Sequence, residues 1–391
     1  MKRNNSYTYV EIAGVSYLLP YGQMIADHKH GIQINKTGIF LWEQLKEDHP
    51  FEELLELLAR HYGMTEEEKE AQRPGLEKFL GTLASHGILQ VHPQNFALPK
   101  YPGRFYEIAG LLLKLAGSDE TFPATLEPFA ISEEMVANPR NLDLVISIQN
   151  GCPPVSPNGT TLLRNKELVV MEHINHYILL FPASSQILEV HLTKDGSRAR
   201  FYCTPPYTDE FRESLFHAIR LVFLYLAQKK QMVALHSASI LYKGKAWLFS
   251  GPSGTGKSTH TGIWNSVFET PVLNGDLNLI DIKTGNPVIH GIPWCGTSGI
   301  CDTASHPLGG IILLKRDSED FVEELFENDR QLLVVQRLIT PAWTEEQLLW
   351  NLSLTKQITD QSLVCRLHCT PTIPAAAAMK EYLDQQNTDH F

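Results

Sequence analysis

A nine-residue glycine-rich segment constrains this chain more than any other feature of its sequence. The segment fits G-x-x-x-x-G-K-[ST], a pattern whose glycines let the backbone turn tightly so that its N–H groups point inward at an anion. The lysine of this pattern reaches the β- and γ-phosphates of a nucleotide, and the next hydroxyl ligates Mg²⁺. We therefore predict a phosphate-binding loop, with Lys257 as its cation and Ser258 as a metal ligand, made of Gly251, Pro252, Ser253, Gly254, Thr255, Gly256, Lys257, Ser258 and Thr259.

The residues on both sides of the loop favour a nucleotide site over a glycine-rich structural turn. Ala246–Ser250 is a short apolar run typical of a buried strand, and Thr259–Phe268 can form a helix. The amino end of such a helix would face the bound phosphates. Leu235–Tyr242 forms a second strand, and the tight turn before Lys245 makes the two strands antiparallel. A doubly wound parallel fold has a crossover at this point, so we expect a mixed sheet.

The composition narrows the classes of function. The net charge of −11 argues against broad nucleic-acid binding, which needs a basic surface. No stretch approaches 18 apolar residues, so we expect no membrane-spanning helix. The N-terminal residues do not form the apolar block of a secretory signal, and six cysteines in 391 residues do not suggest a disulfide framework. We therefore expect a cytoplasmic protein.

Residues 1–95 have the pattern of a small separate domain. Tyr7–Ile12 and Val15–Leu19 alternate like a hairpin, and three amphipathic helices are expected over Lys36–Leu45, Phe51–His61 and Leu76–Ser85. A short strand, Ile88–Val91, follows. Strands followed by three helices indicate a winged-helix-like module. Since this region holds more acidic than basic residues, we do not expect it to bind DNA.

The apolar spacing across Gln33–Trp42, Phe51–Leu58 and Phe79–Leu89 resembles that of the PqqD-like family. These are small leader-recognition domains of peptide-modifying pathways. The resemblance implies that the leader of a precursor peptide adds as a strand to the edge of the sheet. The alternative is a docking or dimerisation domain without a peptide ligand.

The rest of the chain divides into two regions. Residues 96–208 are expected to be a proline-rich linker and a β-rich region that packs on the region holding the loop, with strands at Leu142–Ile148, Glu167–Glu172, Tyr177–Phe181, Ile187–Leu192 and Ala199–Tyr202. Residues 209–391 hold the loop and begin with a helix that Asp209 is expected to cap. Near the end, Cys365 and Cys369 could be metal ligands, but alternation across Leu363–Leu367 favours a strand. Helices are expected over Glu345–Ile358 and Ala375–Leu383.

An acidic residue downstream of the loop is needed to hold Mg²⁺. Asp276 lies about 20 residues after the loop, between an apolar run and another expected strand, and is the best candidate for both a catalytic and a metal-binding role. Asp281 is a weaker candidate, because it lies late in that strand beside an ordinary turn.

Three segments together resemble the HPr kinase-related family, which shares its core with the ATP-dependent phosphoenolpyruvate carboxykinases. They are His236–Ile240, Gly244–Thr259 and Asn274–Asp276, and Gly291–Thr297 resembles a further segment of less characterised branches. The resemblance implies a P-loop kinase that uses ATP and Mg²⁺ to phosphorylate a hydroxyl, typically of serine in a polypeptide. It also implies a tendency to form homo-oligomers.

One position departs from the family pattern. HPr kinases carry two adjacent acids after the loop, and here Gly275 stands in place of the first. The roles of base and metal ligand therefore cannot both be assigned to Asp276 from the pattern. His236 and His290 are the two candidates for the base, because imidazole suits proton transfer near neutral pH. Arg316 and Arg337 are weaker candidates for contacts to the phosphates.

The sequence thus predicts an α/β (α+β) protein with an N-terminal PqqD-like domain and a C-terminal HPr kinase-like domain. The favoured function is an ATP-dependent kinase that acts on a ribosomally made precursor peptide, whose leader binds residues 1–95. Two alternatives stay open. One is a kinase of a small metabolite or carrier protein, and the other is a nucleotide-responsive binding protein that has lost catalysis with the acid at Gly275.

Overall fold

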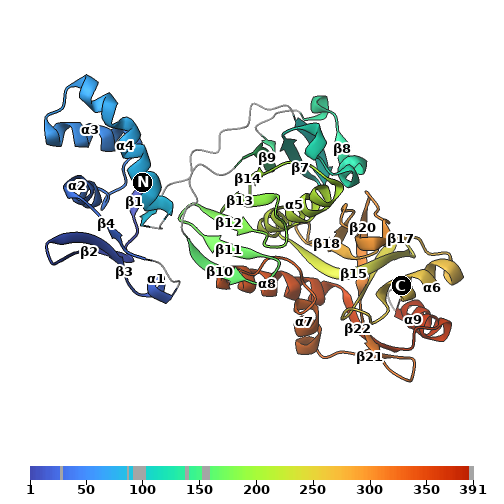
Figure 1. Cartoon of the computed structure of the whole chain (residues 1–391). Helices are drawn as coiled ribbons and strands as arrows, with labels where there is room; N and C mark the ends of the chain where they lie inside the picture. Colours follow the sequence, from blue (N-terminus) through green and yellow to red (C-terminus); the bar gives the residue numbers. More distant parts are fainter. Residues whose placement is uncertain (27–29, 86–87, 91–102, 137–140, 152–158, 387–391) are drawn as a thin grey trace. The chain divides into compact units, whose positions relative to one another are not determined.

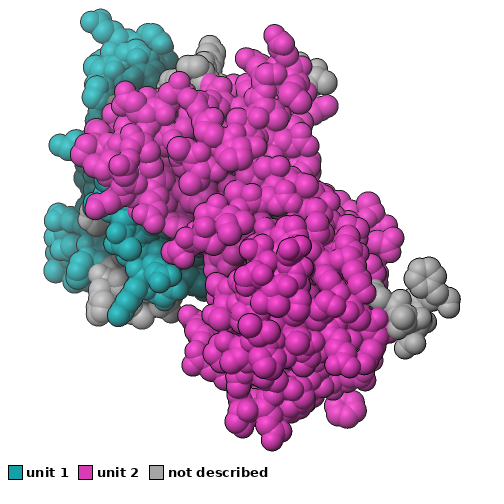
Figure 2. All heavy atoms as spheres, turned by 90° about the vertical axis from the view of Figure 1, so that its right-hand side faces the viewer, with its two compact units in different colours: residues 1–97, 151–191 teal, residues 98–150, 192–391 magenta. Residues whose placement is uncertain are grey.

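The computed structural model of the chain describes residues 1–26, 30–85, 88–90, 103–136, 141–151 and 159–386 (Figure 1). Contacts within the chain define two compact units, coloured teal and magenta in Figure 2. The first comprises residues 1–97 and 151–191, and the second comprises residues 98–150 and 192–391. Both contain helices and strands, so the protein belongs to the mixed α/β class.

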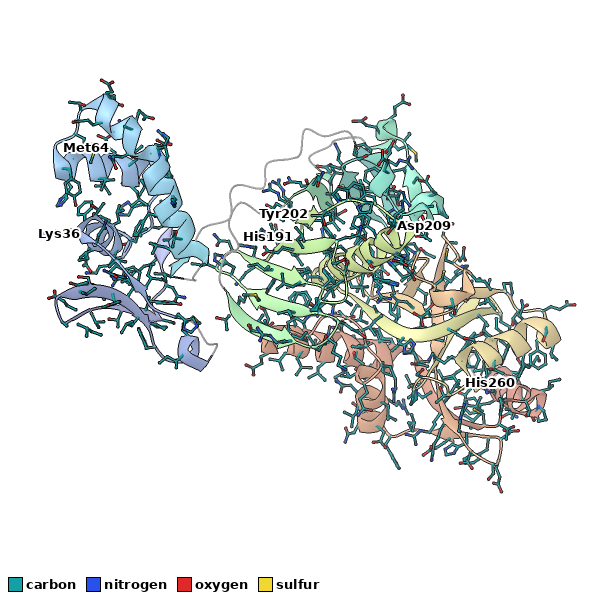
Figure 3. All side chains as sticks on the ribbon, in the orientation of Figure 1. Lys36, Met64, His191, Tyr202, Asp209 and His260 are labelled. Atoms are coloured by element: carbon teal, nitrogen blue, oxygen red, sulfur yellow. The ribbon has the colours of Figure 1, made fainter. Side chains whose placement is uncertain are left out.

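The N-terminal part of the first unit is a small α/β module. Its strands form a three-stranded antiparallel sheet in the order β2-β3-β4 and a separate pair, β1-β5. Figure 3 labels Lys36 at the start of α2 and Met64 in the turn after α3. The elements are β1 (Lys2–Arg3), β2 (Tyr7–Ile12), β3 (Val15–Pro20), α1 (Gln23–Ala26), β4 (Ile32–Gln33), α2 (Lys36–Gln44), α3 (Phe51–Tyr62), α4 (Glu66–Ser85) and β5 (Leu89–Gln90).

The hairpin and the first two helices of this module are confirmed. The side chain of Asn35 caps α2 by accepting a hydrogen bond of 2.8 Å from the N–H of Gly38. The third helix begins ten residues earlier than predicted, at Glu66. Its first half is polar and contains Pro74, so it lacks the apolar spacing that marks a helix in a sequence. The helices and the sheet share one core that includes Trp42 and Leu54.

The remaining strands of the first unit form an antiparallel set, β10 (Thr160–Arg164), β11 (Val169–Glu172) and β12 (His176–Leu180). The chain then passes through β13 (Ile187–Thr193) into the second unit. The strands predicted near β11, β12 and β13 are confirmed within a few residues. Val91, the last residue of the strand predicted at Ile88–Val91, lies outside the described residues.

The second unit contains hydrogen-bonded strands in the order β14-β9-β7-β6-β8. Three of these strands, β6, β7 and β8, were not predicted; they follow the proline-rich linker in a stretch without a clear strand pattern. β6 and β7 form a hairpin around Ala109 and Gly110, which both have positive φ. The strands are β6 (Gly103–Ile108), β7 (Leu111–Ala116), β8 (Ala130–Ile131), β9 (Leu144–Asn150) and β14 (Arg198–Cys203).

Helix α5 (Asp209–Lys229) follows β14, and Asp209 at its first position is labelled in Figure 3. The predicted cap was one residue too late, because the side chain of Thr208 accepts the hydrogen bond from the N–H of Phe211. The apolar face of the helix is buried as predicted and includes Leu215 and Val222.

The second sheet of this unit is mixed, as predicted. β15 pairs with β16 antiparallel, whereas β16 and β22 each pair with β20 parallel. The path through the sheet is β16-β15-β18-β19-β20-β22-β21, with β17 on β15. The strands are β15 (Met232–Tyr242), β16 (Lys245–Ser250), β17 (Val272–Asn274), β18 (Leu277–Asp281), β19 (Val288–His290), β20 (Ser305–Arg316), β21 (Phe321–Glu324) and β22 (Leu363–Cys369).

Both faces of this sheet are buried under helices. Along β16, Ala246 and Leu248 join a core with residues of α7 (Glu327–Val335) and α8 (Glu345–Gln361). Trp247 and Phe249 point to the opposite core, with residues of α6 (Lys257–Phe268) and α9 (Ile373–Gln386). Figure 1 shows α6 and α9 together at one end of this unit. A strand buried on both faces reads as a continuous apolar run, which is why β16 could be predicted.

Gly309 in β20 lies close against the ring of Trp247. A Cβ at Gly309 would lie 2.5 Å from the ring of Trp247, whereas one at Gly262, on the exposed side of α6, would meet nothing within 4 Å. We expect Gly309→Ala to destabilise the protein by about 1–3 kcal/mol through overpacking. Gly262→Ala should stabilise it by up to about 1 kcal/mol, because alanine is the better helix former. Urea unfolding of both variants tests this, and equal midpoints would contradict it.

Candidate functional site

The site is built beside His236 and Ser237, in the middle of β15. One edge of β15 pairs with β18 up to His236 and with β17 from Ser239, and its other edge pairs with β16 from Ser237. In this register His236 lies opposite Leu277, the first residue of β18, and Ser237 lies opposite Ser250, the last residue of β16. The glycine loop leaves β16 directly after Ser250, and Asp276 directly precedes β18. β15 therefore holds the loop and Asp276 on either side of His236 and Ser237.

The glycine-rich segment has the strand–loop–helix arrangement that the motif predicts. β16 ends at Ser250, the loop follows, and α6 begins at Lys257. Gly254 and Gly256 have φ of +76° and +102°, which favours glycine. Gly251 also needs to be glycine, because a Cβ would lie 2.7 Å from Oγ1 of Thr255.

Side chains of the loop differ in their exposure. Pro252, Ser253, Ser258 and Thr259 are exposed, whereas Lys257 is partly buried. No side chain in the described part of the chain caps the first turn of α6, so its N–H groups face the loop. The glycine loop is closed by a hydrogen bond of 2.7 Å, which the hydroxyl of Thr255 donates to the carbonyl of Pro252. This geometry suits an anion at the helix amino end.

Lys257 lies over the loop, with Nζ 3.4 Å from the carbonyl oxygen of Gly251. Burial lowers the pKa of Lys257, and the nearby charge of Arg337 lowers it further, while Asp276 opposes both. Arg337 also accepts a backbone hydrogen bond of 3.0 Å from His236 through its carbonyl. Arg316 donates a hydrogen bond to the carbonyl of Gly254. Both candidate arginines thus lie at the loop.

Asp276 and His236 form a pair. Nε2 of His236 lies 3.3 Å from Oδ1 of Asp276, and the side chains are 35% and 36% exposed, so both are accessible to a substrate. The hydrogen bond from His236 lowers the pKa of Asp276 against the opposing effect of burial. The positive charges of Arg220 and Lys257 lower it further. Asp276 is therefore held as a carboxylate.

His290 contacts Asp281 and Ser305 instead of Asp276. Its Nε2 lies 3.2 Å from Oδ2 of Asp281, and its Nδ1 lies 2.7 Å from the hydroxyl of Ser305. Burial raises the pKa of Asp281, but the hydrogen bonds from His290 and Lys283 outweigh it, and the net pKa is lowered. Of the two predicted base candidates, His236 is the one that the structure pairs with Asp276.

A buried polar network holds the turn that carries Asp276. Oδ1 of Asn274 accepts the backbone N–H groups of Asp276 and Leu277, each at 3.0 Å. Nδ2 of Asn278 donates to the carbonyl of Ser237 at 2.7 Å, and its Oδ1 accepts from Ser239 at 2.7 Å. These four residues, Asn274, Asn278, Ser237 and Ser239, are at most 4% exposed. They were not predicted, although polar residues within buried apolar strands were a usable signal.

Gly275 is tightly enclosed by a neighbouring loop. A Cβ at Gly275 would lie 2.2 Å from the hydroxyl oxygen of Ser298 and 3.1 Å from the carbonyl oxygen of Cys295. Across from it, a Cβ at Gly296 would lie 2.7 Å from Cβ of Asp276. The loop from Cys295 to Ser298 therefore occupies the space that an acidic side chain at residue 275 would need. This loop can pack so closely only because residue 275 has no side chain, and Asp276 is then the one acid of this turn.

Asp276 also lines a pocket of about 660 Å³ in the second unit. The pocket is bordered by the segment from Pro123 to Pro128, by α5 and by the loop from Pro293 to Cys301. Trp294 in this loop is held by its indole N–H, which donates to the carbonyl of Phe216 at 3.1 Å. The carboxylate thus has the glycine loop as one neighbour and the pocket as another.

The residues fit a magnesium–nucleotide complex. Mg²⁺ prefers oxygen ligands and commonly takes only one or two from the protein, with the rest from phosphates and water. Ser258 offers an exposed hydroxyl in the first turn of α6, and Asp276 a partly exposed carboxylate. Among the described residues, no group of three or more His, Cys, Asp and Glu side chains could hold a metal alone. In the same part of the chain, no helix is both long and apolar enough to cross a membrane.

Comparison with known proteins adds little. No protein-family model matches the chain, and no curated protein matches it. Among solved structures, it is similar to the Hpr(Ser) kinase/phosphatase from Coxiella burnetii over 40% of this chain and 94% of that one, with 8% identity and a TM-score of 0.25. A TM-score this low carries no argument about fold or function, so the site's own geometry must support any function.

Asn274 tests how far the buried network positions the site. We expect Asn274→Ala to destabilise the protein by about 1–3 kcal/mol, because it leaves two N–H groups without their acceptor. Asn286→Ala, at an exposed turn position of the same unit, should change stability by less than about 0.5 kcal/mol. Urea unfolding measures both variants. A small effect of Asn274→Ala would mean that water replaces the amide.

Proposed function

We propose that this protein is an ATP-dependent kinase that phosphorylates a serine hydroxyl of a ribosomally made precursor peptide. The observation that carries the proposal is the meeting of the glycine loop and the Asp276–His236 pair at the middle of β15. A phosphate-binding loop beside an ionised carboxylate and an imidazole is the set of groups that phosphoryl transfer needs.

The phosphates of ATP would bind at the loop between Gly251 and Thr259. The backbone N–H groups at the start of α6 and the ammonium of Lys257 supply donors and positive charge. Arg337 and Arg316, which lie at the loop, add to this positive field. Phosphoryl transfer depends mainly on positioning and on such electrostatic stabilisation.

The chemical step would run through Asp276 and His236. The acceptor oxygen forms a bond to the γ-phosphorus as the bond between that phosphorus and the bridging oxygen breaks, and ADP leaves. The hydroxyl proton passes to His236, which Asp276 orients through the contact of 3.3 Å. Mg²⁺, held by Ser258 and Asp276, would neutralise phosphate charge when bound. With His236 as base, one carboxylate is enough, and Gly275 does not preclude catalysis.

The peptide part of the proposal rests on the N-terminal module. In the described residues, β2 is an edge strand of the sheet β2-β3-β4, and an open edge suits addition of a leader peptide as a further strand. A leader bound on residues 1–95 would raise the effective concentration of the acceptor at the kinase site. This supports a peptide over a free metabolite as the acceptor.

Incubation of the full-length protein with ATP, Mg²⁺ and the precursor peptide encoded beside its gene tests the function. Mass spectrometry should show the addition of one phosphate on the peptide. Removing the leader from the peptide should lower kcat/KM by about tenfold or more, because the tethering is lost. Transfer that ignores the leader would favour a metabolite or carrier kinase. Nucleotide binding without any transfer would favour a non-catalytic binding protein.

Substitution of the carboxylate tests its role. We expect Asp276→Asn to lower kcat by about 10²–10³-fold, because it removes charge placed for the transition state. Its Kd for ATP should change by less than about threefold, since the loop contacts remain. Asp360→Asn, on the exposed face of α8, is the matched control and should keep full activity. Stopped assays and equilibrium binding measure both, and an unchanged kcat in Asp276→Asn would remove Asp276 from the mechanism.

A further inference from the structure

The pocket beside Asp276 has walls of mixed character. Pro123, Ala124, Phe216, Pro293 and Trp294 supply apolar surface from three segments far apart in the sequence. The rings of Phe216 and Trp294 are stacked with centroids 5.6 Å apart, and the buried indole is fixed by its hydrogen bond. A rigid aromatic wall in a pocket of about 660 Å³ is typical of a small-molecule or side-chain site.

The charges that line the pocket are balanced or negative. Nη1 of Arg212 lies 2.6 Å from Oδ1 of Asp209, and its Nε donates to the carbonyl of Glu120. The positive charge of Arg212 is therefore paired within the protein. The positive charge of Arg220 acts on Asp276. Glu213 adds a further negative charge to the lining.

His217 does not change this balance. Burial lowers the pKa of His217, and the charge of Arg220 adds to the effect, so the imidazole is mostly neutral at pH 7. The lining charges are then Arg212 and Arg220 against Asp209, Glu213 and Asp276. The pocket therefore offers no surplus positive charge to an anionic ligand.

Asp276 connects the pocket to the site of the proposed phosphoryl transfer. Its carboxylate pairs with His236 at the end of the glycine loop and also lines the pocket. No residue from Gly251 to Thr259 is among the pocket's described lining residues. A ligand in the pocket would thus approach Asp276 without taking the place of the phosphates.

We propose that this pocket is the acceptor site, and that it selects a hydroxyl flanked by apolar side chains over one flanked by acidic side chains. The inference rests on the proposed kinase function and names the acceptor chemistry of the same site. Proline and aromatic walls bury the apolar flank, the excess of negative over positive lining charges disfavours acidic neighbours, and the hydroxyl meets Asp276 and His236. Burial of apolar groups supplies the affinity.

A photoreactive peptide tests the site directly on the full-length protein. The probe is Gly-Gly-photoleucine-Ser-photoleucine-Gly-Gly, irradiated with the protein and ADP, with the labelled residues mapped by mass spectrometry. We expect labels on residues 123–128, on the first half of α5 and on residues 293–301. Unlabelled peptide with leucine flanks should compete at about tenfold lower concentration than the same peptide with aspartate flanks. Labels confined to other segments, or equal competition, would overturn the proposal.

Two tryptophan substitutions provide a matched pair. Ala124 lines the pocket and is exposed, so Ala124→Trp should fill it and reduce labelling by about tenfold. Ala130, also exposed and in the adjacent strand β8, is not among the described lining residues, and Ala130→Trp should label like the parent. Thermal melting checks that both variants fold. Equal labelling of the two variants contradicts an acceptor site here.

Two further readouts separate this inference from the kinase proposal. Pocket labelling without phosphate transfer to any peptide would reject the kinase and retain the pocket as a peptide site. Phosphate transfer that Ala124→Trp leaves intact would retain the kinase and reject the pocket as its acceptor site. An azido-ATP probe should label segments beside the glycine loop. If it labels residues 123–128 instead, the pocket holds the nucleoside, and the inference is wrong.

Discussion

The pairing of β15 on both of its edges is the constraint on which the site depends. Because β16 ends opposite Ser237 on one edge and β18 begins opposite His236 on the other, the ends of those two strands flank the same two residues. The hydroxyl of Ser250 reinforces the junction by donating to the carbonyl of His236 at 2.7 Å, and the N–H of Ser237 donates to the carbonyl of Asp276 at 3.0 Å. The glycine loop and the carboxylate are therefore both tied to this pair of residues, the first through the Ser250 hydroxyl and the second through a backbone hydrogen bond.

The buried polar residues make this junction specific. Amides and hydroxyls in an apolar core cost free energy unless every group is paired, so such a network admits few alternative arrangements. Asn274 satisfies the N–H groups of the turn, and Asn278 ties that turn to β15 through Ser237. The same turn admits only glycine at residue 275, because the loop around Ser298 packs against it. The glycine at residue 275 and the close packing of this loop therefore depend on each other.

The parts predicted from the sequence are those governed by local patterns. The loop, its strand and helix, the hairpin β15–β16 and the helix α2 follow from glycine spacing and apolar runs. The early start of α4 and the hairpin β6–β7 were missed, because the first is polar and the second follows a proline-rich stretch. Pairing between distant strands has no local signal. The placement of Asp276 beside His236, and of Asp281 beside His290, therefore needed the structure.

In the proposed kinase, the rigidity of the site explains how one carboxylate would be enough. In a loose transition state little proton transfer precedes phosphoryl transfer, so orientation matters more than basicity. Asp276 is fixed by its own backbone bonds, by His236 and by the packing of Gly296 against its Cβ. A carboxylate held this rigidly can orient metal and imidazole together, whereas a second acid would require the loop at Ser298 to withdraw. That loop also lines the pocket, so moving it to make room for a second acid would disrupt the proposed acceptor site.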